Sequence, residues 1–212
     1  SAIRSEDTKL KFRHQDDALV IKMDQPTNKG EIRTFIIQYR GVPEAGLEIK
    51  NNQFGDRTFF CENWPNNTRH WLPTIDHPYE KATVEFKIIA PAKYKVVSNG
   101  LLMEESLLTE NNKFTHWKQS VPVSCWLYVL GVAEFAVQQV GTFEGKPIQT
   151  WVYAKNRDAG FHDFVYPTKN VLEFFSQYVG PFAYEKLANI QSSSVTRGAM
   201  ETASAILYAE NL

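Results

Sequence analysis

Histidine and cysteine are the side chains of this sequence that could hold a metal or act as nucleophiles. The histidines are His14, His70, His77, His116 and His162. No two of them stand four residues apart around a glutamate, so the sequence contains no HExxH zinc-binding helix. It also lacks a GxSxG nucleophile turn and a glycine-rich phosphate loop. By its residues alone, the chain is not a complete catalyst.

The closest pair of histidines and the two cysteines give no specific signal either. Pro73 lies between His70 and His77 and prevents the regular helix that would align two metal ligands. Cys61 and Cys125 are the only cysteines, and their spacing fits neither a zinc knuckle nor a disulfide framework. We expect both cysteines to be small buried apolar side chains.

Residues 61–78 form an unusually aromatic connection, with two tryptophans, three prolines, several amides and several acids. One interpretation is an ordered loop held by Trp64 and Trp71, with Arg69 paired to Asp76. The other interpretation is the wall of a binding pocket. Composition favours the two about equally.

The overall composition limits the partners. The chain has 23 basic and 24 acidic residues and no basic run longer than two, which argues against a nucleic-acid partner. No apolar segment approaches the length of a membrane-spanning helix. The longest one, at 125–133, is rich in β-branched and aromatic residues and is expected to be a buried strand.

The elements that would position a site are predicted to be mainly strands up to residue 155. Val84, Phe86 and Ile88 alternate with Glu85 and Lys87, so one face of this strand should be buried. Evenly spaced strands separated by turns indicate an antiparallel, sandwich-like or saddle-like domain over residues 1–155. The expected strands are 19–21, 34–39, 82–89, 94–97, 114–118, 127–137 and 148–153, with turns at 26–30, 41–43, 98–100 and 110–112.

Residues 156–212 are expected to open a second domain with α/β character. The polar segment 155–160 marks the boundary. Apolar residues at 171, 174, 175 and 178 follow helical spacing, and Gly180-Pro181 would end that helix. Pro167 suits the first position of the helix. Strands are expected again around 187–190 and 203–208.

Residues Gly198-Ala199-Met200-Glu201-Thr202 resemble the GxMEN substrate-binding motif of zinc aminopeptidases of the aminopeptidase N and leukotriene hydrolase family. Segments 64–78, 82–86 and 97–100 are similar to the β domain of that family, and 121–135 resembles the strand before its domain junction. The segments follow the family's order from about Leu10 to the end. The resemblance implies a mainly β amino-terminal domain followed by the opening of a thermolysin-like catalytic domain.

The resemblance also implies a function, which is the zinc-dependent removal of amino-terminal residues from peptides. The glutamate of the motif, here Glu201, would bind the free ammonium group of the substrate, since a partly desolvated carboxylate pairs strongly with an ammonium. Gly198, Ala199 and Met200 would pair their backbone groups with the substrate in strand fashion.

Two departures from the family pattern concern the site. Thr202 stands where the motif has asparagine, which puts the positioning of the substrate carbonyl in question. The family has a second amine anchor, a glutamine or glutamate, and the matching position here is Trp64. Glu62 and Asn63 lie just upstream, and Glu62 is the better candidate for this anchor. Trp64 could instead line the pocket for the first substrate side chain.

The zinc ligands of the family have no counterpart in these 212 residues. We therefore expect a fragment of a longer enzyme that binds no zinc and is inactive alone. Its partners would be a peptide with a free amino terminus, the rest of the catalytic domain and a carboxyl-terminal helical domain. The first strands of the family's β domain are expected to be missing.

Two alternatives remain open, a non-catalytic β-sandwich interaction module and a family member that has lost catalysis. The sequence leaves the compartment undecided between the cytoplasm and an exported location.

Overall fold

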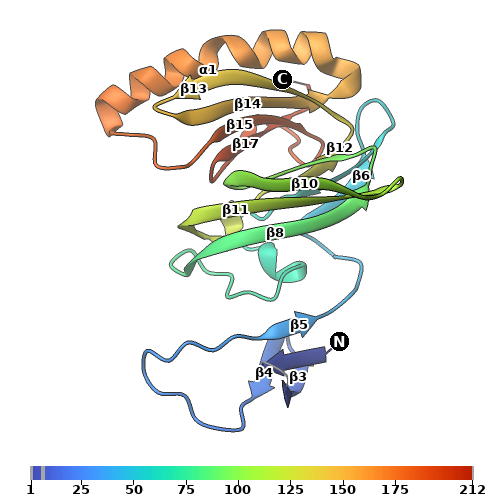
Figure 1. Cartoon of the computed structure of the whole chain (residues 1–212), viewed down its shortest axis with the longest axis vertical. Coiled ribbons are helices and arrows are strands. Elements are labelled where there is room, and N and C mark those ends of the chain that lie inside the picture. The colour runs from blue at the N-terminus through green and yellow to red at the C-terminus, as the bar shows by residue number, and fades with distance from the viewer. Residues whose placement is uncertain (1, 6–7, 212) are drawn as a thin grey trace. The chain divides into compact units, whose positions relative to one another are not determined.

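The computed structural model describes residues 2–5 and 8–211, which divide into two compact units, 1–44 and 45–212 (Figure 1). The smaller unit consists of short antiparallel strands. One sheet has the order β2-β1-β5, and β3 and β4 form a separate hairpin. Ile3 and Leu10 are its buried apolar side chains. The strands are β1 (Ala2–Ser5), β2 (Thr8–Lys9), β3 (Lys11–Gln15), β4 (Ala18–Lys22) and β5 (Ile36–Gln38).

The larger unit contains three sheets. A four-stranded sheet has the order β6-β7-β12-β9, with β6 (Leu47–Asn51), β7 (Arg57–Cys61), β9 (Lys95–Ser98) and β12 (Leu130–Ala133). A three-stranded sheet has the order β10-β11-β8, with β8 (Lys81–Pro91), β10 (Leu101–Thr109) and β11 (Asn112–Ser124). A five-stranded sheet has the order β13-β14-β15-β17-β16, with β13 (Phe135–Phe143), β14 (Lys146–Tyr153), β15 (Leu187–Ser192), β16 (Ala199–Thr202) and β17 (Ala205–Ala209).

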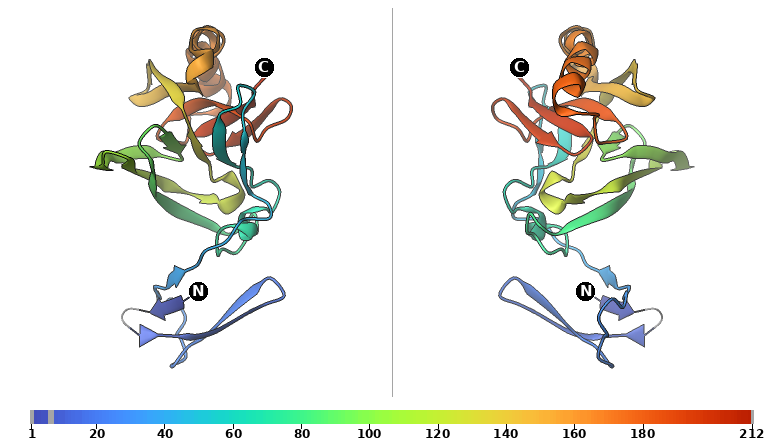
Figure 2. Two further views of the ribbon diagram at one scale, coloured as in Figure 1. Left: turned by 90° about the vertical axis from the view of Figure 1, so that its right-hand side faces the viewer. Right: turned by 90° about the vertical axis from the view of Figure 1, so that its left-hand side faces the viewer.

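The helical elements are one long helix, α1 (Arg157–Val179), and three single turns of 3-10 helix, η1 (Thr68–His70), η2 (Cys125–Leu127) and η3 (Ala154–Asn156). Within the larger unit, α1 covers one face of the five-stranded sheet, and the other two sheets lie on the opposite side (Figures 1 and 2). No helix of the described residues is long and apolar enough to cross a membrane.

The main core of the larger unit takes side chains from all three of its sheets, with Ala90 and Trp117 coming from the three-stranded one. Phe60, Val97 and Leu130 of the four-stranded sheet and Trp151 and Ile190 of the five-stranded sheet belong to the same buried cluster. Burial of each such side chain contributes about 1.5–3 kcal/mol. The chain is thus mainly β, as predicted, and β8 buries Phe86 while Glu85 and Lys87 stay exposed, as its alternation predicted.

The prediction for the start of the helix was wrong. The helix begins at Arg157, and Pro167 lies inside it. Gly160 explains the early start, because a Cβ atom there would lie 2.6 Å from Val152 Cγ1, so this first turn packs closely on β14. The predicted end is confirmed, since Gly180 follows the last residue with φ +100°. The apolar residues of the periodic pattern are about half exposed or more.

Two expected strands also differ. The first three residues of segment 125–133 form the turn η2, and only its last four form the strand β12. The strand expected at 127–137 is interrupted at Glu134, so β12 and β13 join different sheets. β13 and β14 share a sheet with β15, β16 and β17, so hydrogen bonding continues across residue 155. The domain boundary at 155 stays a prediction.

Candidate functional site

Residues 198–202 form the outermost strand of the five-stranded sheet. β16 pairs antiparallel with β17, with Ala199 opposite Tyr208, and the N–H of Ala209 donates to the Gly198 carbonyl at 3.0 Å. Hydrogen-bonded pairs alternate along an antiparallel ladder, so the backbone groups of Ala199 and Glu201 point away from β17. In the described part of the chain, this edge of β16 carries no further strand.

The side chains of β16 divide between its two faces. Met200 packs against the main core, and Thr202 is buried. Glu201 is exposed. It lies opposite Ile206 of β17, so it shares a face with Tyr208, two residues further along β17. The pKa of Tyr208 is raised by burial and, to a smaller extent, by the charge of Glu201. The Glu201 carboxylate is therefore available to a cation at the open edge.

The turn between β16 and β17 fixes the position of this edge. Ser204 has φ +64°, and its hydroxyl oxygen accepts a hydrogen bond from the Gly100 N–H at 2.7 Å. The hydroxyl of Thr202 donates to the Ala205 carbonyl at 2.7 Å. Because the Thr202 hydroxyl is hydrogen-bonded within the turn, its side chain points back into the hairpin and not toward the open edge.

Asn99 ties the same turn to the rest of the unit. Its side-chain amide nitrogen donates to the carbonyls of Ala203 at 2.7 Å and Leu127 at 3.0 Å. Its amide oxygen accepts from the Val129 N–H at 2.6 Å. Sequence reasoning noted residues 98–100 only as a turn and as a resemblance segment. It missed Asn99 and Ser204 as residues that position the site.

The three candidates for a second anchor differ in what their side chains do. Asn63 is buried and hydrogen-bonded within the loop, since its amide donates to the Tyr128 carbonyl at 2.9 Å and accepts from the Trp71 indole at 2.8 Å. Trp64 is 55% exposed. Glu62 accepts from the Trp64 N–H at 3.2 Å. Its pKa is raised, mainly by burial and also by the charge of Glu48, so its carboxylate would gain from a cationic partner.

The end of η2, at Leu127 and Tyr128, links the two candidate regions. Asn63 donates to the Tyr128 carbonyl, and the Ala203 N–H donates to the carbonyl of the preceding residue, Leu127, at 3.2 Å. The loop with Glu62 and the strand with Glu201 are thus attached to consecutive peptide units. Within residues 2–5 and 8–211, however, no hydrogen bond or ion pair joins Glu62 itself to β16.

The connection 61–78 is an ordered loop. The Arg69 N–H donates to the Asp76 carboxylate at 3.1 Å and its guanidinium to the Asp76 carbonyl at 2.9 Å, while Trp71 stacks on Phe86. The ordered loop does not exclude a pocket wall, because Trp64 stays exposed. Both cysteines are buried and unbridged, as predicted.

Neither cysteine is suited to nucleophilic catalysis. Burial raises the pKa of the Cys61 thiol to about 12. The pKa of Cys125 is also raised, mainly by burial and also by hydrogen bonding to Asp76. The reactive thiolate is therefore scarce at neutral pH at both positions.

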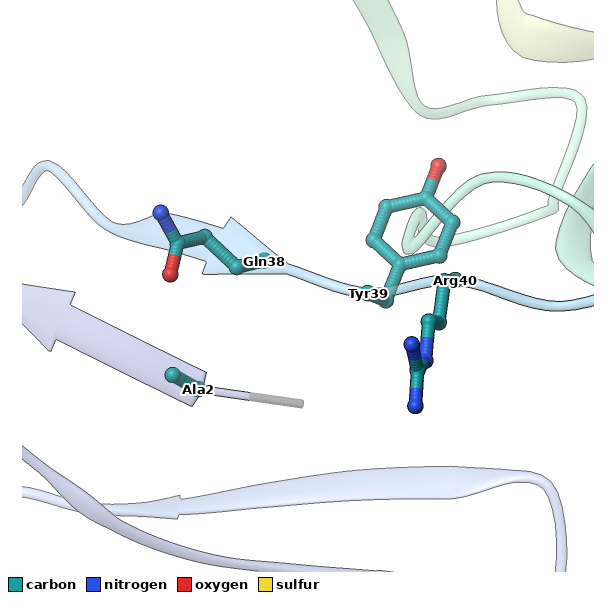
Figure 3. Close-up of a pocket in the computed structure, with 4 residues that line it drawn as sticks. All are labelled: Ala2, Gln38, Tyr39 and Arg40. Atoms are coloured by element: carbon teal, nitrogen blue, oxygen red, sulfur yellow. The ribbon is translucent and has the colours of Figure 1, made fainter.

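The described residues do not fit a zinc site, because no group of three or more histidine, cysteine, aspartate or glutamate side chains among them could hold a metal ion. His116 pairs with Glu85 and His162 with Asp163. A pocket in the smaller unit is lined by Ala2, Gln38, Tyr39 and Arg40 (Figure 3). These four lining residues include none of the usual metal ligands.

Comparisons with known proteins concern the family and the fold of the chain. Residues 1–127 match the family described as Peptidase M1 N-terminal domain. Glutamyl aminopeptidase of Rattus norvegicus is 29% identical over 147 residues, which are 69% of this chain and 15% of that protein. The enzyme of that name from Sus scrofa is 30% identical over 150 residues, 69% of this chain and 16% of the relative.

Solved structures match the whole chain. A mutant M1 zinc metallopeptidase from Deinococcus radiodurans aligns with a TM-score of 0.86 and 22% identity, over 100% of this chain and 50% of that one. A mutant of this enzyme bound to a Tyr-Ser-Ala substrate aligns with a TM-score of 0.85 and 21% identity, over the same shares of the two chains. The chain thus spans half of these solved chains and about 15% of the curated relatives. The structural match includes β16, which lies beyond residue 127.

Proposed function

Because the chain belongs to the family of Peptidase M1 N-terminal domains, we propose that it supplies the substrate-recognition part of a zinc aminopeptidase. It binds the free amino end of a peptide at the open edge of β16. The full-length protein then removes the first residue of that peptide. The observation that carries this proposal is the exposed Glu201 on a strand edge whose outward backbone groups pair with no other strand of the described residues.

Each part of the edge has a chemical role. The backbone N–H and C=O groups of Ala199 and Glu201 pair with an extended peptide as an added strand would. The Glu201 carboxylate binds the α-ammonium, which only an unblocked peptide carries. Ala199 has a small side chain, so the backbone of the substrate can approach closely. Met200 anchors the strand from below through its contact with the core.

Glu62 is the second anchor for the ammonium in this proposal. Partial burial already disfavours its charged form, and an arriving ammonium would restore the balance. Asn63 holds the loop through its two hydrogen bonds. Trp64 is left to contact the first substrate side chain. Thr202 contributes indirectly, by closing the β16–β17 turn.

Zinc belongs to the full-length protein in this proposal. The solved relatives are zinc metallopeptidases, and the described residues of this chain do not fit a metal site. The hydrolytic step is therefore assigned to residues outside this chain. The remaining part of the catalytic domain and a helical carboxyl-terminal domain are its proposed partners.

An assay of the full-length protein tests the proposal. We expect hydrolysis of the unblocked tripeptide Tyr-Ser-Ala with release of free tyrosine, no cleavage of the N-acetylated tripeptide, and loss of activity after treatment with a zinc chelator. Equal cleavage of the blocked and unblocked peptides would contradict amino-end recognition. Full-length protein that binds zinc but does not cleave either peptide would instead indicate a family member that has lost catalysis.

A further inference from the structure

Lys186 is a lysine with no solvent-exposed surface, just before β15. Lysine is almost never fully buried unless its amine has partners. Its Nζ donates to the Ser98 carbonyl at 2.7 Å, lies 3.5 Å from the Ser204 hydroxyl, and stands 4.8 Å from the centre of the Trp117 ring. Burial lowers the pKa of Lys186 to about 7, while the charge of Glu185 acts in the opposite direction.

The partners of Lys186 belong to the two parts of the candidate site. Ser98 ends β9, which is joined through β12 to β7, the strand that leads directly into Glu62. Ser204 lies in the turn that follows β16. The Lys186 amine therefore stands between the sheet that carries one proposed anchor and the hairpin that carries the other.

An apolar residue at this position would avoid the cost of desolvating an amine. Replacing buried charged groups by well-packed apolar ones is often neutral or stabilising. What an amine adds is directional hydrogen bonding, which fixes the separation between two structural elements. The charged group that acts on Lys186 is Glu185, whose carboxylate accepts from the Ser120 N–H at 2.9 Å. The residues that contact the Lys186 amine, Ser98, Trp117 and Ser204, are neutral.

We propose that Lys186 is a positioning residue that holds the β16–β17 turn against the Ser98 carbonyl and so sets the position of the β16 edge relative to Glu62. The inference rests on the proposed function of that edge as the peptide-binding site. It assigns no contact between Lys186 and the substrate.

Amide hydrogen exchange in this chain tests the proposal. In Lys186→Met, the amides of Met200 and Thr202, which bond to β17, are expected to exchange at least about tenfold faster. The amides of Thr150 and Ile190, in β14 and β15 of the same sheet, are expected to keep their rates. The Met variant is expected to stay folded, because its side chain can fill the apolar space beside Trp117.

A second variant tests the route through the turn. Ser204→Gly keeps the positive φ without strain and removes the hydroxyl next to Lys186. Ser204→Gly also removes the acceptor of the Gly100 N–H. The effects of Ser204→Gly and Lys186→Met on exchange in β16 should therefore add only in part in the double variant. Lys93→Met is the matched control, because Lys93 is an exposed lysine of the same unit paired with Glu134. It should change none of these rates.

The pH profile separates the amine from the aliphatic stem. The ordinary pKa of lysine is about 10.4, so between pH 7 and 10 the unfolded chain holds a proton that folded Lys186 has lost. Raising the pH through this window therefore favours the folded state. We measure the equilibrium ratio of folded to unfolded molecules for the wild type and divide it by the same ratio for Lys186→Met. This quotient should rise nearly tenfold per pH unit between pH 7.5 and 9.5.

Two outcomes would overturn the proposal. One is unchanged exchange of Met200 and Thr202 in Lys186→Met, and the other is faster exchange spread evenly over the whole five-stranded sheet. These measurements use no peptide, so they do not depend on substrate recognition. If Lys186→Met does not speed exchange in β16 but the wild-type chain binds peptide, only the role of Lys186 is rejected. If Lys186→Met does speed exchange in β16 but the wild-type chain binds no peptide, the proposed function is rejected.

Discussion

Replacement of Glu201 by glutamine is expected to lower kcat/KM of the full-length protein for unblocked peptides by about 100-fold. Glutamine keeps the size and hydrogen-bonding capacity of the side chain but removes its charge. Glu201 is exposed in the free chain, and a bound peptide would cover it. Truncating one partner of a charge pair buried in this way costs about 2–5 kcal/mol, and about 3 kcal/mol corresponds to roughly a 100-fold change. Steady-state hydrolysis of Tyr-Ser-Ala measures the effect, and zinc content should remain unchanged.

The control for Glu201→Gln is Glu104→Gln. Glu104 is also an exposed glutamate on a strand, and it accepts a hydrogen bond from the nearby Ser106 hydroxyl. Its replacement should leave kcat/KM within about twofold, since surface substitutions away from a site have small effects. A less than threefold loss for Glu201→Gln would remove Glu201 from the recognition site.

Replacement of Gly100 by alanine is expected to be the most destabilising glycine-to-alanine change in the larger unit, at about 4 kcal/mol or more. Gly100 has φ +72°, and an added Cβ would lie 1.8 Å from the Lys118 carbonyl oxygen and 2.6 Å from the Gln119 Cα atom. These are backbone atoms of β11, which cannot move aside as a side chain can. The clash also disturbs the hydrogen bond from Gly100 to Ser204.

Gly55→Ala is the matched control for Gly100→Ala. Gly55 has a similar φ of +81°, but a Cβ there meets no atom within 4 Å. Only the left-handed backbone conformation is then penalised, at about 1–2 kcal/mol. Urea unfolding of both variants measures the difference. A Gly100→Ala variant as stable as Gly55→Ala would show that the turn is not held tightly against β11.

Many of the strands were predictable because their signal is local, although β6, β7 and β10 were not among the expected strands. Alternation in β8 shows which of its faces is buried, and the β-branched and aromatic composition of β14 is typical of a buried strand. The start of α1 was not predictable in this way. Pro167 has the local signature of a helix start, whereas the true start depends on the close packing of Gly160 on Val152. That contact forms between α1 and β14 only in the folded chain, and neither residue type predicts it from the sequence.

The residues of the candidate site also differ in whether a local sequence signal reveals them. Glu201 was accessible to sequence reasoning because its motif is contiguous. Lys186 and Asn99 were not, because their roles depend on partners that are far away along the chain, Ser98 and Ala203. In the sequence, Lys186 is an ordinary charged residue beside Glu185. Its burial appears only when β9, β11 and the β16–β17 turn come together around it.

The central claim is that the β16 edge binds the free amino end of a peptide through Glu201. Nuclear magnetic resonance of the isotopically labelled 212-residue chain with millimolar Tyr-Ser-Ala tests it most directly. We predict shifts of the Ala199 and Glu201 amides and of the Glu201 carboxyl carbon, which are absent with the N-acetylated peptide and in Glu201→Gln. Equal shifts with the acetylated peptide, or binding that leaves β16 unperturbed, would contradict the claim.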